Sequence, residues 1–293
     1  MSMSLLVFDI GGQGVKHAIW HESSLLDKGS FATPANWDSL KLAMKEVLVI
    51  AQEKHEITGV AISSPGSVDS QAGVIHGISA VQYLHEFEIV KAWQELFELP
   101  VSIENDANAA ALAELDYGIA KDYKNVAFMI IGSGIGGAIA INGELVKGQH
   151  LFAGELGYML LDHENTLSNL SSSLLQINRH NAAHPELPIA NGLELFSLAE
   201  VDDPAAKAMV NEIYDSLARG IYNLSLIIDP ELVAIGGGIS VRPEITRVLT
   251  ERVSQLLDRQ GAADIKPNIQ VCQFFNDANL IGAAVHFERT FLS

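Results

Sequence analysis

The sequence predicts an α/β protein of two domains that are built from one repeated unit. Three observations support this prediction. Apolar, strand-like segments alternate with amphipathic helical segments along all 293 residues. The order of segments in the first half returns in the second half. In each half, the first strand runs directly into a cluster of glycines. The length fits two domains of roughly 150 residues each.

The first half reads as three strands, a helix, and then alternating strands and helices. The strand at 5–10 is apolar apart from Asp9, and glycines follow it directly. The segment 37–54 places apolar residues three and four positions apart, which predicts a helix with one buried face. The remaining elements of this half are strands expected at 15–21, 24–31, 59–63 and 100–104, and helices expected at 88–97 and from residue 107.

The second half begins with an apolar strand at 126–131 that runs into a second glycine cluster. The next strand, at 138–141, ends at Asn142-Gly143, a strong hairpin signal because both residue types tolerate positive φ. An irregular stretch is expected after this hairpin. The remaining elements are a long helix at 205–228, a strand at 232–236, a helix at 243–257, a strand at 269–274 and a helix at 278–289.

Two such units that face one another would enclose a cleft, with a glycine turn of each unit directed towards it. This is the architecture of the ribonuclease H-like fold of actin and hexokinase, and it differs from a single Rossmann sheet. The periodicity is interrupted near 118–124, so we expect a smaller first domain at 1–119 and a larger second domain at 120–277. The last segment, 278–293, is a candidate to pack back on the first domain.

The composition disfavours several functions. Lys and Arg number 18 against 36 Asp and Glu, and the formal net charge of −18 disfavours nucleic-acid binding, which depends on neutralising phosphates. The chain has no apolar run of about 18 residues that would predict a membrane span. Its first residues lack the basic start and apolar core of a signal peptide. Cys272 is the single cysteine, which excludes an internal disulfide and a cysteine-rich zinc site. We therefore expect a cytoplasmic protein.

The first glycine cluster carries the earliest candidate site. Asp9 ends a strand and is followed by Gly11, Gly12 and Gln13 in a tight turn, where backbone amides can approach phosphate oxygens. Asp9 would hold a hydrated Mg²⁺, because this ion takes oxygen ligands and keeps several waters. An ordinary hairpin turn with a surface aspartate remains the alternative.

Two later glycine clusters extend this interpretation. Gly132, Ser133 and Gly134 lie in a stretch that satisfies the dinucleotide pattern G-x-G-x-x-G, but a strand and a hairpin follow instead of a helix. This context excludes the dinucleotide site and leaves a second phosphate-binding hairpin as the functional interpretation. The alternative is a glycine-rich turn whose glycines serve only to make the chain reverse tightly. Gly236 and Gly237 form, with a third glycine, a surface on which a flat adenine or a ribose would fit. Close packing of a helix on a strand is the alternative there.

The segment ENDAN marks the junction of a strand and an alanine-rich helix. Either Asn105 or Asp106 could simply cap that helix. In the functional interpretation, Asp106 accepts the proton of a substrate hydroxyl. Two further turns could supply sugar contacts: the backbone amide of Gly66 in SPGSVD, and the carboxylate of Glu155 in AGELGY. Taken alone, each of these could be an ordinary surface turn.

The order and spacing of these motifs resemble those of the ROK family (repressors, open reading frames, kinases). The shared segments are DIGG, SSPGSVD, IENDANAAALAE, IGSGIGGAI, AGELGY and AIGGGIS, and with LIGAA near the end they cover essentially the whole chain. The resemblance implies a sugar kinase that uses Mg-ATP, with Asp106 as the catalytic base. It also implies sugar-binding positions and nucleotide-binding turns, the former at Gly66, Asn105 and Glu155, the latter at Gly11, Gly12, Gly132, Ser133, Gly134, Gly236 and Gly237.

The chain departs from this family at two places. Kinases of the family with a structural zinc carry a histidine after AGE-x-G and then a cysteine cluster, whereas this chain has Tyr158 and no cysteine there. His150 and His163 without thiolates would make a poor zinc site, so no zinc is expected. Tyr158 is counted among the expected substrate-binding residues. The other departure is Gln13-Gly14, where the family usually has Thr and often Lys.

Zinc-lacking relatives of this kind include β-glucoside kinases, which phosphorylate O6 of the non-reducing glucose of cellobiose-like disaccharides. The resemblance therefore favours a β-glucoside kinase, with a kinase for free glucose, another hexose or an N-acylmannosamine as the alternative. A ROK transcriptional regulator is disfavoured, because the first strand leaves no room for a helix-turn-helix. The resemblance also suggests a homodimer with ATP and a small sugar as its ligands, and without nucleic-acid or membrane partners.

Overall fold

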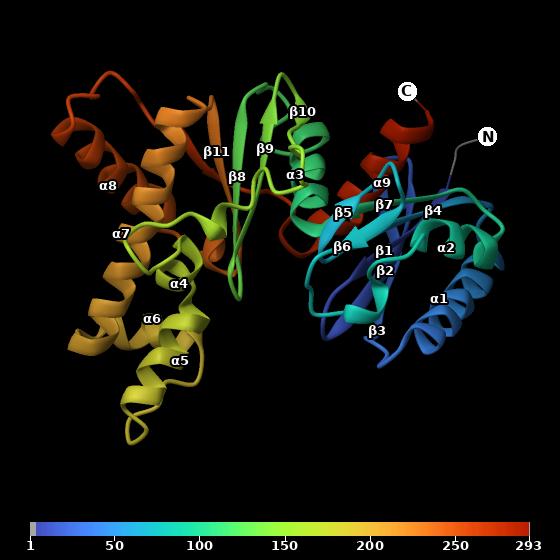
Figure 1. The fold of residues 1–293 in the computed structure, drawn as a ribbon, viewed down its shortest axis with the longest axis horizontal. Coiled ribbons are helices and arrows are strands. Elements are labelled where there is room, and N and C mark those ends of the chain that lie inside the picture. Colours follow the sequence, from blue (N-terminus) through green and yellow to red (C-terminus); the bar gives the residue numbers. More distant parts are fainter. Residues whose placement is uncertain (1–3, 293) are drawn as a thin grey trace. The chain divides into compact units, whose positions relative to one another are not determined.

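The computed structural model describes residues 4–292, which fall into two compact units (Figure 1). Unit 1 contains the described residues up to Gly118, the segment Gln149–Phe152, and the residues from Asn276 onward. Unit 2 contains Ile119–Gly148 and Ala153–Phe275. The first unit is thus assembled from both ends of the chain.

The sheet of unit 1 has five strands in the order β3-β2-β1-β4-β7. β1 pairs antiparallel with β2 and parallel with β4, and every residue of β1 is buried. Since both neighbours of β1 are strands, it lies at the centre of the sheet and needs apolar residues on both faces. The bounds are β1 (Ser4–Ile10), β2 (Gly14–His21), β3 (Ser24–Ala32), β4 (Ile57–Ser64) and β7 (Val101–Asn105).

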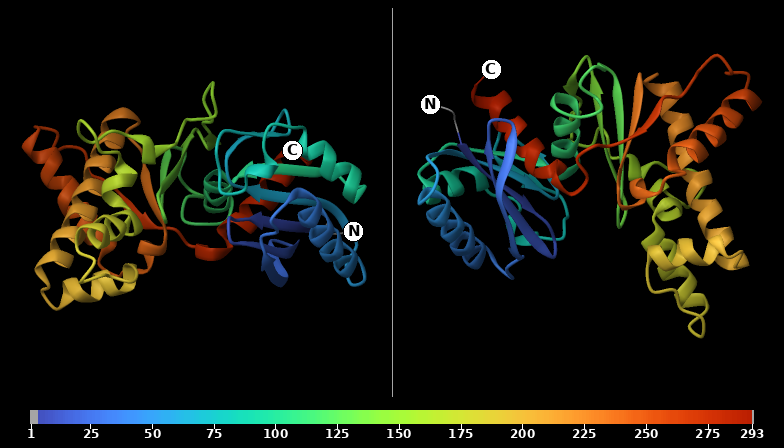
Figure 2. Two further views of the ribbon diagram at one scale, coloured as in Figure 1. Left: turned by 60° about the horizontal axis from the view of Figure 1, so that its bottom comes forward. Right: turned by 180° about the vertical axis from the view of Figure 1, so that it is seen from behind.

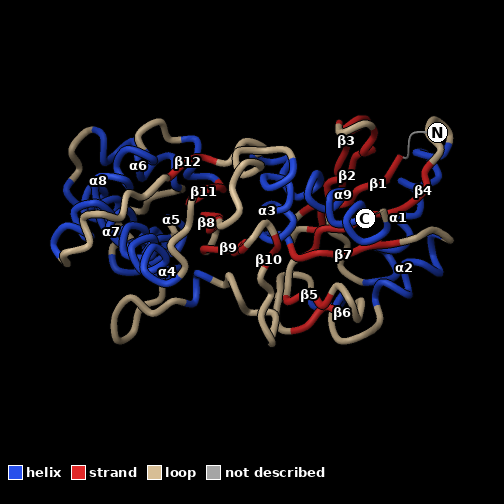
Figure 3. Tube along the Cα trace, turned by 90° about the horizontal axis from the view of Figure 1, so that it is seen from above, coloured by secondary structure: helices blue, strands red, loops and turns tan. Residues whose placement is uncertain are grey.

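Helices cover both faces of this sheet (Figure 3). Leu6, Phe8 and Ile10 of β1 share one core with α1 (Trp37–Gln52) and α2 (Ile89–Phe97). The opposite face packs against α9 (Ala278–Phe291), which also packs along α3 (Asp106–Asp116). The last helix of the chain therefore lies beside its first strands, as both views of Figure 2 show.

The sheet of unit 2 repeats the topology of the first sheet. Its order is β10-β9-β8-β11-β12, and its first strand, β8, pairs antiparallel with β9 and parallel with β11. The β9–β10 hairpin turns at Asn142 and Gly143, and both have the positive φ that their residue types predicted. The predicted duplication is therefore present in the strand order and in the sense of each pairing. The bounds are β8 (Val126–Ile131), β9 (Ile135–Ile141), β10 (Glu144–Leu145), β11 (Leu232–Gly237) and β12 (Ile269–Val271).

The core of unit 2 lies between its sheet and two long helices, α7 (Pro204–Ile227) and α8 (Ile245–Arg259). The expected irregular stretch after the hairpin was wrong in part, because it contains three short helices. Each begins at a polar residue whose side chain accepts a backbone N–H, a cap that the sequence offered. These helices are α4 (Leu167–Ser171), α5 (Ser173–Ala183) and α6 (Gly192–Glu200), capped by Thr166, Ser172 and Asn191.

A small two-stranded sheet in unit 1 was also missed. It consists of β5 (Ser67–Asp69) and β6 (Val74–His76), between the strand expected at 59–63 and the helix expected at 88–97. Three-residue strands are too short for an alternating pattern to reveal them. Among residues 4–292, none of the helices combines the length and the apolar character needed to cross a bilayer.

The packing of α9 on α3 depends on a glycine. A methyl group at Gly282 would lie 1.7 Å from the backbone oxygen of Ala109. We expect Gly282→Ala to lower the free energy of unfolding by at least the ~1–3 kcal/mol that is typical of overpacking. Alanine is the better helix former by about 1 kcal/mol, so stabilisation by this substitution would contradict the close contact. Denaturant unfolding, with the exposed Thr290→Ala of the same helix as control, measures the difference.

Candidate functional site

Asp106 lies where β7 ends and α3 begins. Asn105 is the residue that caps the helix, because its Oδ1 accepts hydrogen bonds from the backbone N–H groups of Ala107 and Asn108, at 3.0 and 3.1 Å. Asp106 Oδ1 also accepts from the N–H of Ala107, at 2.8 Å, and from Asn105 Nδ2, at 3.1 Å. Of the two cap candidates, Asn105 thus fulfils that role, and Asp106 follows as the first residue of the helix.

The carboxyl group of Asp106 is unusually hard to ionise. Its pKa is raised to about 6, chiefly because burial disfavours the charged form. The negative charge of Asp9 raises the pKa further, whereas the hydrogen bonds from Ala107 and Asn105 lower it. A carboxylate with a pKa near 6 is mostly ionised at neutral pH and more basic than an ordinary aspartate, which suits a general base.

Asp9, in the same unit, is 7% exposed and is surrounded by donors. Its Oδ1 accepts from Ser63 Oγ at 3.1 Å and from Asn279 Nδ2 at 3.0 Å. Its Oδ2 lies 3.4 Å from Lys16 Nζ. These three partners were missed as site residues. Lys16 stands in the first glycine motif and Ser63 at a strand end, but Asn279 is 270 positions away and only the fold brings it close.

Gly66 is connected to the same helix start. Asn105 Nδ2 donates to the backbone oxygen of Gly66 at 3.0 Å, so one side chain links Gly66, Asp106 and the helix N-terminus. Gly66 has a φ of +105°, and a methyl group there would lie 2.7 Å from Ile75. The turn before β5 therefore requires glycine for its conformation and its space.

The first glycine turn of unit 1 is closed by a hydrogen bond from Gly11 N to Gly14 O, at 2.9 Å. Thr33 Oγ1 donates to Gly11 O at 2.6 Å and fixes the turn from the side of β3. A methyl group at Gly12 would lie 2.7 Å from Cβ of Ala80. The side chain of Gln13 is exposed.

The second glycine turn lies in unit 2 and has a similar closure, from Gly132 N to Gly134 O at 2.8 Å. Ser172 Oγ donates to Ser133 O at 2.7 Å, so the start of α5 holds this turn in place. The glycines at 136 and 137 belong to β9 rather than to the turn.

Gly236 and Gly237 form the end of β11, where they pair with the end of β8. Gly237 has a φ of +84°, and a methyl group there would lie 2.2 Å from the backbone oxygen of Ile131. Gly237 therefore packs closely on the neighbouring strand β8, whereas the alternative interpretation expected a helix packed on a strand. Gly238, the first residue of the 3₁₀ helix η3 (Gly238–Val241), has nothing within 4 Å of such a methyl group.

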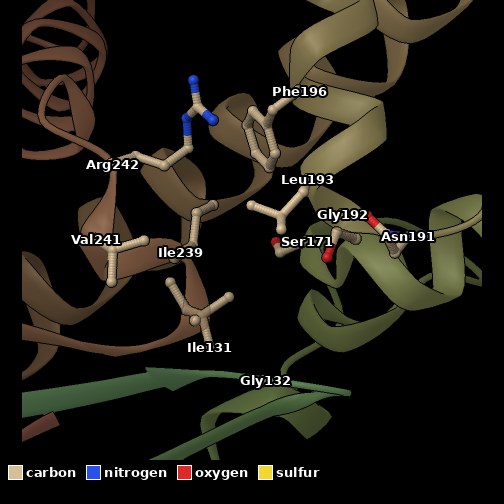
Figure 4. A pocket seen from close by; sticks show the side chains of 12 residues that line it. Ile131, Gly132, Ser171, Asn191, Gly192, Leu193, Phe196, Ile239, Val241 and Arg242 are labelled. Atoms are coloured by element: carbon tan, nitrogen blue, oxygen red, sulfur yellow. The ribbon is translucent and has the colours of Figure 1, made fainter.

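A pocket of roughly 370 Å³ opens in unit 2 beside these turns (Figure 4). Gly132 and Gly238 line it, whereas Gly236 and Gly237 do not. Most of its wall is apolar, and the guanidinium of Arg242 lies 4.3 Å from the centre of the Phe196 ring. The apolar lining consists of Ile131, Leu193, Phe196, Ile239 and Val241.

Glu155 and Tyr158 belong to unit 2, whereas Gly66, Asn105 and Asp106 belong to unit 1. Glu155 is partly buried and Tyr158 is 70% exposed. Gly154 and Gly157, on either side of Glu155, allow this segment to pack closely against the backbone of β9. A methyl group at Gly154 would lie 2.9 Å from Ala138 Cα, and one at Gly157 would lie 2.2 Å from Ile135 O.

Residues 4–292 contain no group of three or more His, Cys, Asp and Glu side chains arranged to hold a metal ion. The loop after Tyr158 is closed instead by Asp162, which accepts from the backbone N–H groups of Glu164 and Asn165 at 2.9 and 2.7 Å. These bonds and those from the Asn165 side chain hold the pKa of Asp162 at about 2.

The chain is similar to known proteins over nearly its whole length. The ROK family pattern matches residues 5–290. A beta-glucoside kinase of Listeria innocua is 33% identical over 97% of each chain, and an N-acetylmannosamine kinase of Vibrio vulnificus is 31% identical over 99% of this chain and 100% of its own. The crystal structure of a ROK family protein from Streptococcus pneumoniae in complex with sucrose superposes with a TM-score of 0.89. It is 33% identical and covers 98% of this chain and 99% of its own.

The family match, the relatives of similar length and the duplicated α/β topology therefore all indicate the same family and fold. The two-domain fold of the actin and hexokinase type, predicted from the repeat, is confirmed by these structural relatives. The chain belongs to the ROK family, as one of its ATP-dependent carbohydrate kinases.

Proposed function

We propose that the chain transfers the γ-phosphoryl group of ATP to the O6 hydroxyl of a glucose unit, within a β-glucoside such as cellobiose. The observation that carries this proposal is the Asp106 carboxylate, whose pKa is raised to about 6 at the start of α3. The name of the Listeria relative and the disaccharide held by the Streptococcus relative support a glucoside as the acceptor.

Asp106 is the residue that takes the proton from the accepting hydroxyl. Its Oδ1 is held by Ala107 and Asn105, so the carboxylate enters the reaction in one orientation. Asn105 and Gly66, linked at 3.0 Å, are proposed to bind sugar hydroxyls beside it. Glu155 and Tyr158 of unit 2 are the proposed contacts at the other end of the sugar.

Asp9 fits a Mg²⁺ ion that is held through water and phosphate rather than by a protein cage. It supplies one buried carboxylate at the end of β1, and its charge already acts on Asp106. A hydrated ion of this kind needs only one or two carboxylates together with the phosphates. When bound, Mg-ATP supplies the phosphoryl group and neutralises its negative charge.

The nucleotide is proposed to bind at the two glycine turns and in the pocket of unit 2. The backbone N–H groups of residues 12–13 and 133–134 would bind phosphate oxygens, since those of Gly11 and Gly132 already close the two turns. The apolar wall of the pocket suits the base, and its volume of roughly 370 Å³ is in the range of small-ligand sites. Gly238, rather than Gly236 or Gly237, is the glycine that would touch the nucleoside.

A kinase for a free hexose or an N-acylmannosamine is the second candidate, because the Vibrio relative bears the name of an N-acetylmannosamine kinase. It shares the same base and the same turns, so only the acceptor distinguishes the two. We also propose that the protein acts without zinc, in the cytoplasm and as a homodimer.

Replacing Asp106 by Asn removes the proton acceptor and keeps the oxygen that binds Ala107. We expect kcat to fall by about 10²–10⁴-fold, as for the loss of a positioned base. Coupled measurement of ADP release with sugar and ATP gives kcat. Asp116→Asn, at the far end of the same helix, is the control and should stay within about twofold of wild type. Near-normal turnover by Asp106→Asn would refute the assigned role.

Activity should depend on pH through the same group. The unprotonated carboxylate is the active form, so log(kcat/KM) is expected to rise with pH up to about 6 and to level off above it. An acid limb near pH 4, the ordinary value for aspartate, would count against Asp106 as the titrating base. Circular dichroism at each pH separates titration from unfolding.

Stability should show the opposite trend. Because the pKa of Asp106 is higher in the folded than in the unfolded chain, folding favours the protonated form. The raised pKa adds its full contribution to the free energy of unfolding below about pH 4. This contribution is lost as the pH rises through about 6. Asp106→Asn should therefore have a higher Tm than wild type at pH 8, with a smaller difference at pH 5. An equal or lower Tm of this variant at pH 8 would contradict the cost of the buried charge.

The acceptor can be identified by a panel of sugars in the same ADP-release assay. We expect cellobiose, gentiobiose or arbutin to be phosphorylated with higher kcat/KM than glucose, mannose or N-acetylmannosamine. A 6-deoxyglucoside lacks the proposed acceptor oxygen and should release no ADP above the sugar-free background. Activity confined to free monosaccharides would exclude the β-glucoside and leave the kinase assignment intact.

A further inference from the structure

Ser171, the last residue of α4, has a buried hydroxyl without a partner. Its residue exposure is 0%, and its Oγ makes no hydrogen bond within the described part of the chain. An unpaired buried hydroxyl destabilises a fold, so such groups are rare and often have a ligand or a function. The structure offers one, because Ser171 lines the nucleotide pocket of unit 2.

The position of Ser171 along this pocket is well defined. The next residue, Ser172, donates to Ser133 O at 2.7 Å, which places Ser171 next to the glycine turn proposed for the phosphates. In Figure 4, Ser171 lies between Gly132 on one side and Phe196 with Arg242 on the other. A glycine of the turn, a serine and apolar side chains thus line the same pocket.

A nucleotide has three groups that match this lining: phosphates, a ribose with two hydroxyls, and a flat base. We propose that Ser171 Oγ hydrogen-bonds a ribose hydroxyl of the phosphoryl donor and so distinguishes ribonucleotides from deoxyribonucleotides. This inference rests on the proposed function, since it assumes that the pocket holds the nucleoside.

A ribose hydroxyl suits this position better than the other parts of the nucleotide. A serine hydroxyl can donate one hydrogen bond and accept two, as a sugar hydroxyl can. The backbone N–H groups of the turn would bind the phosphates, and the apolar residues of the pocket wall would pack on the base. Ser173, at the start of α5, also lines the pocket and is a second polar neighbour for the ribose.

The test measures dissociation constants of ATP, 2′-deoxy-ATP and 3′-deoxy-ATP by calorimetry, with Mg²⁺ and without sugar. For Ser171→Ala, ATP should bind about three- to tenfold more weakly than to wild type, the loss of one hydrogen bond. One of the two deoxynucleotides should bind wild type and Ser171→Ala equally, because it lacks the hydroxyl in question. The deoxynucleotide that behaves in this way shows whether Ser171 binds the 2′ or the 3′ hydroxyl.

Ser102→Ala is the matched control. Ser102 is 5% exposed, and its Oγ likewise has no partner among the described residues, but it lies in β7 of unit 1. Neither substitution removes a hydrogen bond within the protein, so neither should lower Tm, and Ser102→Ala should bind all three nucleotides as wild type does.

Two results would overturn the proposal: unchanged ATP affinity of Ser171→Ala, or an equal loss for ATP and both deoxynucleotides. The first would mean that the hydroxyl serves the protein alone, and the second that it contacts another part of the nucleotide. Absence of ATP binding to the wild-type protein would instead contradict the proposed function itself.

Discussion

Much of unit 1 serves to hold two acidic side chains, Asp106 and Asp9, close together and away from solvent. Burial and the charge of Asp9 both oppose ionisation of Asp106. The Asp9 carboxylate is held in place by Ser63, Asn279 and Lys16, which come from β4, α9 and β2. The sheet, its parallel crossovers and the returning C-terminal helix are thus all needed to bring two acidic groups together.

The capping of α3 serves the same constraint. Asn105 satisfies the backbone N–H groups of Ala107 and Asn108 at the start of the helix, and Asp106 accepts from Ala107 through its Oδ1. The amide nitrogen of Asn105 connects to Gly66, whose positive φ no larger residue would adopt without strain. A residue that a sequence presents as a cap therefore organises both the proposed base and the turn proposed to bind the sugar. The helix that carries both is in turn fixed against α9 through Gly282 and Ala109.

Much of this could be predicted from local patterns. Apolar periodicity located the strands of both sheets, and Asn142-Gly143 gave the hairpin, because these features depend on neighbouring residues only. The order of the motifs identified the ROK family and the kinase class. The short helices α4, α5 and α6 were not predicted, although their caps were visible, because helices of 5, 11 and 9 residues have too few turns for a clear apolar period.

Other features depend on contacts that no local pattern encodes. Asn279 reaches Asp9 only because α9 returns to the first sheet. The unpaired hydroxyl of Ser171 and the exclusion of Gly236 and Gly237 from the pocket are likewise properties of packing. Sequence also could not decide between Asn105 and Asp106 as the cap, since both types suit that position, whereas the hydrogen bonds do.

The pKa of Asp106 in the folded protein is the quantity on which the account depends most. It can be measured directly by ¹³C NMR of the aspartate carboxyl carbons between pH 3 and 9, with Asp106→Asn to assign the signal and Asp9→Asn to test the coupling. We expect a value of about 6 that falls when the charge of Asp9 is removed. A value near 4 that is unaffected by Asp9→Asn would contradict the account of Asp106 as a base prepared by its surroundings.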